Sequence, residues 1–220
     1  TARELNAEGA LTALMRDALN PNLVQTLAGT PAFVHGGPFA NIAHGCNTLL
    51  ATQTALRFGD IVLTEAGFGA DLGGEKFMDV KARFGDLDVA GAVVVATIRS
   101  QKYNGGQPRD ELTTENLDAL KKGVVNLERH VDNLRKFGLA PIVALNLFGS
   151  DTEAEREYMR QWAKDFGVPL EEADVWSKGG EGATDLAKLV LENLSAGAAT
   201  QLYDPAKGIE ASIETIATQI

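Results

Sequence analysis

The chain has 220 residues, enough for a sizeable hydrophobic core, and its 45% hydrophobic and 23% charged residues are ordinary for a globular protein. Its formal net charge of -10 argues against general nucleic-acid binding, which requires a basic face. A single cysteine excludes an intrachain disulfide and fits a reducing, cytoplasmic location, and no apolar run is long enough to span a bilayer.

The first third of the chain is predicted to contain short helices and short strands. Leu11, Leu14, Met15 and Ala18 recur at helical spacing before an Asn-Pro pair that ends the helix. Further along, we expect a strand at 31–37, a helix at 41–59, a second strand in the apolar run 60–67, and a short helix at 73–85.

The remaining residues show stronger patterns. Residues 89–98 form a β-branched, fully apolar run, which predicts a strand buried on both faces. Residues 113–138 are predicted to form a helix capped by Thr113 or Thr114, with an apolar stripe formed by Leu117, Leu120, Val124, Leu127, Val131 and Leu134. Strands are expected at 140–148 and 168–176, and helices at 151–167, 182–194 and 208–220. The helix at 151–167 is expected to have Asp151 as its cap and Gly167 after its end.

This alternation predicts one α/β domain over residues 1–220, with a mainly parallel sheet and helices on both faces. In such sheets, ligands bind outside the carboxyl ends of the strands. The candidate sites are therefore the strand-to-helix loops at residues 35–41, 65–74, 99–106, 146–152 and 176–182.

The loop "TEAGFGADLGGEKF" (residues 64–77) is rich in glycine. It does not match a dinucleotide-binding turn, because Gly67 and Gly69 are followed by Gly73, one residue too late. A phosphate-binding P-loop motif does not occur anywhere in the 220 residues. A tight turn would explain the glycines but leaves Phe68 unexplained. A flat ring stacked on Phe68 would explain it.

The segment "HGGPFANIAHGCN" (residues 35–47) contains two histidines and the cysteine. The spacing of His35, His44 and Cys46 matches no common zinc pattern, so we expect no metal site. The glycine pair after His35 and the amide of Asn41 are alternative donors to an anion. His130, opposite the stripe of the long helix, is predicted to be solvated.

Two later loops carry polar residues. Asn146 and Asp151 lie too far apart for the base-reading motif of GTP-binding proteins, and we interpret Asp151 as a helix cap. In "VWSKGGEG", Trp176 either fills the core or faces a ligand, and Lys178 would suit a phosphate or carboxylate.

Several of these segments, with "NLERHVDNLRKFG" and "DVWSKGGEGATDLA", occur in the order found in formate–tetrahydrofolate ligase, and the chain resembles that family along nearly all its length. The resemblance implies a P-loop NTPase-like three-layer fold. It also implies that ATP phosphorylates formate, and that tetrahydrofolate takes the formyl group to give 10-formyltetrahydrofolate. The family's Mg²⁺, monovalent cation and homotetramer are implied as well.

The resemblance also implies roles for individual residues. Phe68 and Trp176 match the aromatic positions that sandwich the folate pterin, with Gly67 and Gly69 beside Phe68. His35 and His44 match a segment near the reaction centre and are the expected catalytic residues. The residues expected near the nucleotide are Asn146, Asp151, Ser177, Lys178 and Gly179, and no metal ligands are expected.

The resemblance covers only the middle of the family's chain, without the part that holds the P-loop. We therefore expect a fragment of a longer ligase, and little or no ligase activity from these 220 residues alone. Two other functions stay open at this point: a non-catalytic folate-binding module, and a nicotinamide-dependent oxidoreductase of the same architecture.

Overall fold

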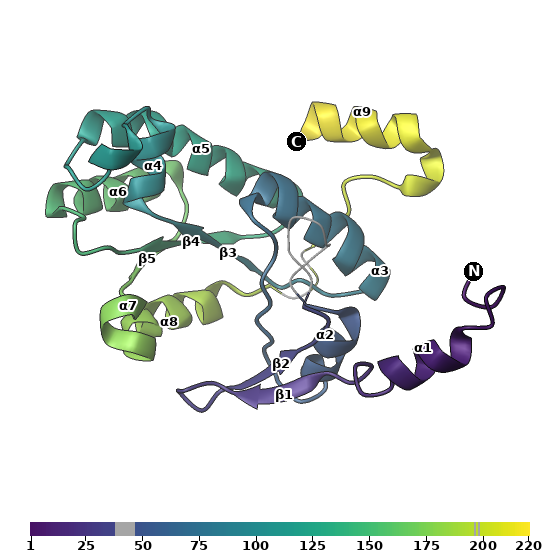
Figure 1. Cartoon of the computed structure of the whole chain (residues 1–220). Helices are drawn as coiled ribbons and strands as arrows, with labels where there is room; N and C mark the ends of the chain where they lie inside the picture. Colours follow the sequence, from purple (N-terminus) through teal and green to yellow (C-terminus); the bar gives the residue numbers. More distant parts are fainter. Residues whose placement is uncertain (38–46, 196, 198) are drawn as a thin grey trace. The chain divides into compact units, whose positions relative to one another are not determined.

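A computed structural model describes residues 1–37, 47–195, 197 and 199–220. By their contacts, the residues form two compact units (Figure 1). The first unit contains Thr1–Phe68 and Leu72–Lys81, and the second contains Gly69–Asp71 and Ala82–Ile220.

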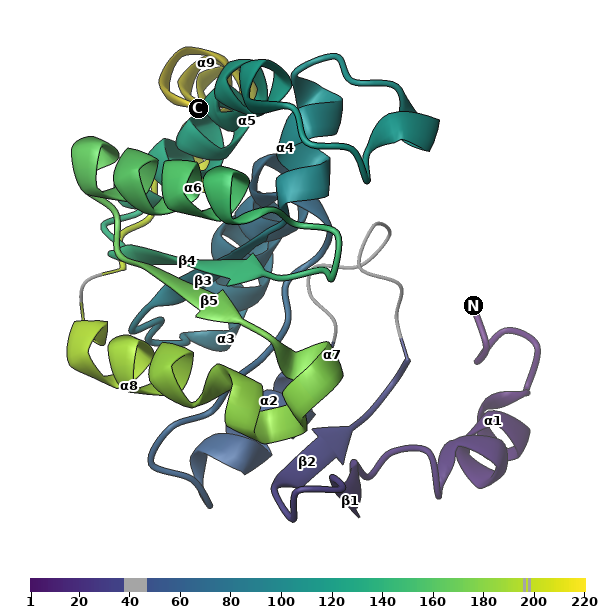
Figure 2. The same ribbon diagram turned by 90° about the vertical axis from the view of Figure 1, so that its left-hand side faces the viewer.

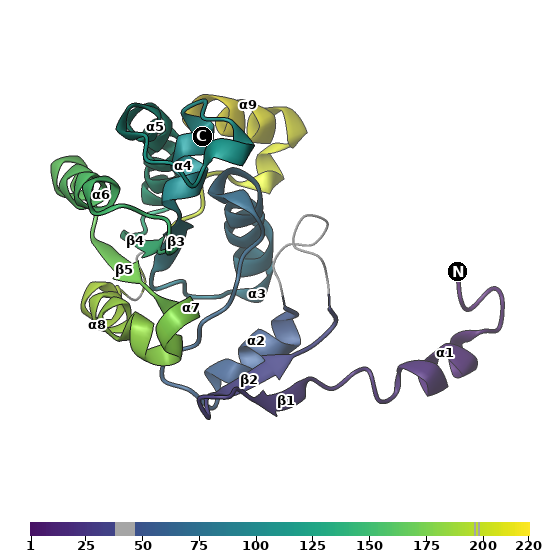
Figure 3. The same ribbon diagram turned by 60° about the vertical axis from the view of Figure 1, so that its left-hand side comes forward.

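The first unit is built on an antiparallel strand pair (Figure 3). Strand β1 (Asn22–Gln25) pairs with β2 (Pro31–Val34), with Asn22 opposite Val34. Gly29, in the connecting turn, has a φ of +87°, which glycine adopts without strain. Helix α1 (Glu8–Met15) precedes the pair, and α2 (Leu49–Leu56) contacts β2.

The strand predicted at residues 60–67 is wrong. These residues form no helix or strand, and they pair with no strand of the described chain. Among the described strands, none supplies the ladder partner that a strand requires, and Ile61 and Leu63 are exposed. The helix predicted at 73–85 is also irregular. Wide π-type turns cover Gly69–Gly74 and Phe77–Ala82, and only the short α3 (Arg83–Gly85) follows.

The second unit contains a three-stranded parallel sheet, as the alternating pattern predicted. Its order is β3 (Ala92–Ala96), β4 (Pro141–Asn146) and β5 (Leu170–Ala173). Val94 lies opposite Val143, and Leu145 lies opposite Glu172. The chain is thus of mixed α/β class, with a parallel sheet and a separate antiparallel pair.

Helices lie on both sides of this sheet (Figure 2). On one side are α4 (Ile98–Asn104), α5 (Leu117–Lys136) and α6 (Glu153–Phe166). On the other are α7 (Val175–Lys178) and α8 (Thr184–Asn193), and α9 (Ile209–Gln219) follows near the end of the chain. Within the described ranges, none of the helices combines the length and the apolar character needed to cross a membrane.

The apolar stripe predicted for the long helix is confirmed. Leu120, Val124, Leu127 and Val131 are buried on α5 and join a core with residues of β3, β4 and α6. The predicted cap of this helix was wrong: the side chain of Asn116, rather than Thr113 or Thr114, accepts the N–H of Ala119. The pattern located the apolar face correctly but not the first turn.

Helices α4 and α5 approach each other through glycines. A Cβ on Gly123 would lie 1.7 Å from the carbonyl oxygen of Gln101, and one on Gly105 would lie 1.8 Å from that of Ala119. Only glycine leaves room for the two backbones at these points. This contact fixes α4, and with it the residues that follow β3.

Candidate functional site

The three parallel strands of the second unit end at one edge of the sheet, where ligands bind in α/β folds. Arg99 follows β3, residues 146–152 include the end of β4 and its loop, and residues 174–179 follow β5. Because β4 lies between the other two strands, its loop separates the segments after β3 and β5.

The loop after β4 is folded by Asp151. Its Oδ2 accepts the N–H of Phe148 at 2.8 Å, and its own N–H donates to the Phe148 carbonyl at 2.9 Å. Asn146 is the last residue of β4. The prediction that Asp151 caps α6 is wrong, because Thr152 is the cap, in a capping box with Glu155. Gly167 ends α6 with a φ of +71°, as predicted.

Asp151 occupies an unusual electrostatic environment. Burial raises the pKa of its carboxyl group, opposed by the hydrogen bond from Phe148 and by the charge of Arg99. Its Oδ1 is buried without a hydrogen-bond partner among the described residues. Arg99 stacks on the Phe148 ring, 4.1 Å from its centroid, and donates to Ser150 at 3.0 Å. Arg99 therefore joins the segment after β3 to the loop after β4.

A buried ion pair joins the helices that carry these loops. Lys102 of α4 donates to Glu155 at 2.8 Å, with 1% and 0% of the two side chains exposed. Lys102 also donates to the Thr114 carbonyl at 2.9 Å, and Glu155 accepts the Asn116 N–H at 3.0 Å. The pair thus connects α4, the start of α5 and the start of α6.

The segment after β5 presents a tryptophan to solvent. Trp176 was expected to end a strand, but it lies in the short helix α7, and 93% of the residue is exposed. It therefore does not fill the core, which was one of the two readings left open. Ser177 donates to Asp174, and Lys178 lies 3.6 Å from the same carboxylate. Gly179 follows with a φ of +60°.

The glycine-rich loop packs closely on itself. A Cβ on Gly73 would lie 2.1 Å from the carbonyl carbon of Gly67, and the Gly73 N–H donates to the Phe68 carbonyl at 3.2 Å. Gly69 has a φ of +73°. Phe68, between Gly67 and Gly69, is 84% exposed. Phe68 and Trp176 belong to different units, so their pairing around one ring stays a prediction.

The histidines differ in their surroundings. Both ring nitrogens of His35 are engaged, with Nε2 2.7 Å from the Ala18 carbonyl and Nδ1 2.8 Å from the Thr48 hydroxyl. Since a carbonyl only accepts, Nε2 carries the proton. His44 lies outside the described residues. The solvated state predicted for His130 is wrong: it is half-buried, with Nδ1 3.8 Å from Asp71 Oδ1.

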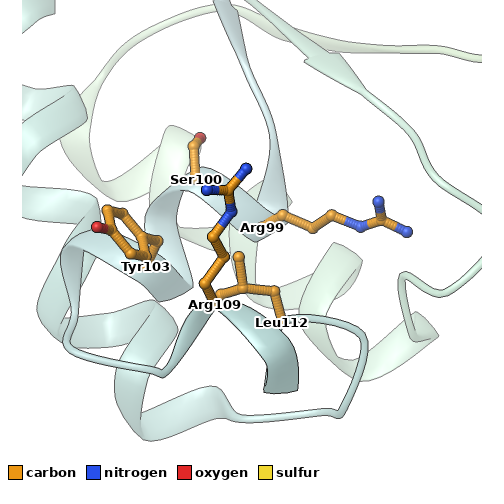
Figure 4. A pocket seen from close by; sticks show the side chains of 5 residues that line it. All are labelled: Arg99, Ser100, Tyr103, Arg109 and Leu112. Atoms are coloured by element: carbon orange, nitrogen blue, oxygen red, sulfur yellow. The ribbon is translucent and has the colours of Figure 1, made fainter.

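A pocket of about 340 Å³ lies beside the end of β3 (Figure 4). It is lined by Arg99, Ser100, Tyr103, Arg109 and Leu112. The side chain of Arg109 extends along α4 toward Ser100 and Tyr103, whereas that of Arg99 points away from them. Sequence reasoning named the loop that contains Arg99 but neither arginine as a site residue.

Arg109 had no local sequence signal. The side chain of Gln107 folds its segment by donating to the carbonyls of Glu111 at 2.7 Å and Thr114 at 3.1 Å, and the Gln107 N–H joins the segment to α4 by donating to the Lys102 carbonyl at 3.0 Å. Such hydrogen bonds within an irregular loop leave no periodic pattern in the sequence. For metals, the described ranges contain no group of three or more His, Cys, Asp or Glu side chains that could hold an ion.

Comparison with known proteins gives a consistent result. All residues, 1–220, match the family model described as formate–tetrahydrofolate ligase. Proteins named formate–tetrahydrofolate ligase from Corynebacterium diphtheriae, Corynebacterium jeikeium and Staphylococcus aureus are 64%, 58% and 55% identical to this chain. Each match covers 100% of this chain, but only 40%, 38% and 40% of the relative. The chain therefore spans about 40% of the length of the curated relatives it matches.

Proposed function

The chain belongs to the formate–tetrahydrofolate ligase family, and on that premise we propose that it is part of an enzyme that joins formate to tetrahydrofolate using ATP. A formate oxygen attacks the γ-phosphorus of ATP and releases ADP, which leaves formyl phosphate. N10 of tetrahydrofolate then attacks the formyl carbon, phosphate departs, and N10 loses a proton to give 10-formyltetrahydrofolate. The observation that carries this proposal is 64% identity to a ligase over every residue of the chain.

The proposed roles follow the positions of the side chains. Trp176 offers an exposed indole face at the ligand-binding edge of the sheet, and an aromatic face of this kind suits a pterin ring. Phe68, between Gly67 and Gly69, offers a second exposed ring. His35 and His44 are proposed to act near the reacting groups. For His35, this action requires that one of its two present hydrogen bonds be given up.

The nucleotide is proposed to lie near the loops after β4 and β5, at Asn146, Asp151, Ser177, Lys178 and Gly179. Lys178 supports this role, because it is exposed and its neighbour Asp174 lies 3.6 Å away without burying it. Mg²⁺ and a monovalent cation are proposed as companions of ATP. No ligand in this chain is assigned to them, because the described residues provide no acidic or histidine cluster.

The fold of the intact ligase is proposed to be a three-layer sheet like that of P-loop NTPases. The helices on both sides of β3–β5 support this (Figure 2). The phosphate-holding loop is proposed to lie in the part of the ligase that this chain does not span, since the 220 residues contain no P-loop motif. A homo-oligomeric assembly and a cytoplasmic location complete the proposal.

The test uses the intact ligase that contains this chain. Product formation should require formate, ATP and tetrahydrofolate together, and Trp176→Ala should raise the KM for tetrahydrofolate about tenfold or more, since stacking on one aromatic ring contributes roughly 1–3 kcal/mol. Phe84→Ala, at another exposed aromatic residue, on α3, serves as the matched control and should leave that KM unchanged. Absence of product with the unmodified protein would contradict the function. An unchanged KM in Trp176→Ala would contradict only the role of Trp176.

A further inference from the structure

The pocket at the end of β3 is lined by two arginines that form no ion pair among the described residues, although the charge of Arg99 acts on the Asp151 carboxyl. In the described part of the chain, neither Arg99 nor Arg109 forms an ion pair, although the protein carries 30 acidic residues against 20 basic ones. Arg109 is exposed and is followed directly by Asp110 and Glu111, yet it pairs with neither. Two guanidinium groups outside ion pairs, of which Arg99 is engaged by Ser150 and Phe148, lie at a ligand-binding edge and indicate an anion-binding function.

The directions of the two side chains indicate what kind of anion fits. The guanidinium of Arg109 lies beside Ser100, whereas that of Arg99 extends away from the other lining side chains, so the two would hold separate anionic groups rather than one (Figure 4). Each guanidinium presents five N–H donors, of which Arg99 gives one to Ser150. Tyr103 and Leu112 add apolar wall between them, which suits a hydrocarbon linker. The pocket therefore fits a dicarboxylate with a short aliphatic spacer.

The pocket is large enough to accommodate one end of a larger ligand. Its 340 Å³ lies at the small end of ligand pockets, which range over roughly 300–1,000 Å³. Arg99 follows β3 and Trp176 lies just beyond β5, with one strand between them. Neighbouring strands lie about 4.8 Å apart, so these two strand ends are separated by about 10 Å along the same edge of the sheet.

We propose that the Arg99–Arg109 pocket binds the glutamate carboxylates of tetrahydrofolate while its pterin lies against Trp176. This inference rests on the proposed function, because that function supplies a substrate with a flat ring at one end and two carboxylates at the other. ATP also joins a flat ring to separate anionic groups, and its phosphates share the chemistry that guanidinium groups recognise. The two sources are distinguished by the choice of ligand in the experiment.

The experiment measures binding to the intact ligase by calorimetry, so that it does not depend on turnover. The ligands are tetrahydrofolate, tetrahydropteroate (the same ring system without glutamate) and ATP. Arg109→Gln should weaken tetrahydrofolate binding about tenfold, the typical effect of losing one charge-assisted hydrogen bond. Binding of tetrahydropteroate and of ATP should not change. Arg109→Lys keeps the positive charge but loses the forked pair of N–H donors, so its affinity for tetrahydrofolate should lie between those of the unmodified ligase and Arg109→Gln.

Lys164→Gln is the matched control, because it removes one positive charge from the last turn of α6, at the opposite edge of the sheet. It should leave all three affinities unchanged. Equal weakening of tetrahydrofolate and tetrahydropteroate, weakening of ATP alone, or no effect of Arg109→Gln would each overturn the inference. If the unmodified ligase binds no tetrahydrofolate, the proposed function fails as well, and the two failures are thus told apart.

Discussion

Lys102 is the least expected residue of the core, since lysine is almost never fully buried without a partner. Its partner Glu155 is equally buried and also accepts the N–H groups of Asn116 and Thr152. Burial alone would raise the pKa of the Glu155 carboxyl, but the hydrogen bonds from Lys102, Asn116 and Thr152 outweigh it, so that the pKa is lowered. A carboxyl group with a lowered pKa stabilises the fold above its unfolded pKa, and this stabilisation is lost as the pH falls through the folded value.

Lys102→Met should lower the free energy of unfolding by about 3–5 kcal/mol near neutral pH, because it leaves the Glu155 charge buried and unpaired. The double variant Lys102→Met/Glu155→Gln should be more stable than Lys102→Met alone, since the neutral amide leaves no buried charge and its oxygen still accepts one of the two backbone N–H groups. Urea unfolding at several pH values measures both effects. The penalty of the single variant should shrink toward acidic pH, where the carboxyl is protonated. Additive losses in the double variant would show that the two residues are not coupled.

At the scale of elements, the contact between α4 and α5 depends on two glycines. In an ordinary helix interior, replacing glycine by alanine stabilises by about 0.5–1 kcal/mol. In Gly123→Ala the new methyl would instead meet the Gln101 carbonyl at 1.7 Å, which the backbones relieve only by moving apart. We expect a net loss of about 1–3 kcal/mol, by analogy with overpacked cores.

Gly9→Ala provides the comparison for this variant. Gly9 also lies within a helix, α1, but a Cβ there would meet no atom within 4 Å. Urea unfolding of the 220-residue chain should show unchanged or slightly increased stability for Gly9→Ala and decreased stability for Gly123→Ala. Equal effects of the two substitutions would mean that the close approach of α4 and α5 does not exist in solution.

The elements also show which features the sequence can predict. The stripe on α5 and the buried strand β4 were recognisable because burial on one face or both leaves a periodic or continuous apolar pattern. The prediction that β3 is buried on both faces is wrong, because Val93 and Val95 are exposed. The run at 60–67 has the same local composition, but a strand also needs a partner, and pairing is not a local property. The cap of α6 failed for a different reason: Asp151 and Thr152 are both good caps, and the local capping box of Thr152 with Glu155, which the sequence already contains, selects Thr152.

The candidate site was predictable to the extent that it depends on strand ends. The sequence placed Trp176 at the end of the last strand, whereas it lies in α7 just beyond β5, and its exposure was left open. Arg109 lies far along the chain from any strand end and reaches the pocket through a loop held by Gln107 and Lys102. No motif records such a return of the chain, so the pocket emerged only from the structure.

At the scale of the whole molecule, the two units differ in how much apolar surface they bury. Strand β4 of the second unit is buried almost throughout, whereas all four residues of β1 in the first unit are exposed. Because apolar burial supplies most of the free energy that opposes opening, the units should differ in local stability.

In hydrogen exchange of the 220-residue chain, amides of β4 and the middle of α5 should exchange only on global unfolding. Those of β1 and β2 should exchange at least about a hundredfold faster, which corresponds to a difference of about 2.7 kcal/mol in opening free energy. The test carries its own control, since Gly123→Ala should speed exchange in β4 and α5 and leave β1 and β2 unaffected. Equal protection of the two strand sets would show instead that both units open together as one cooperative body.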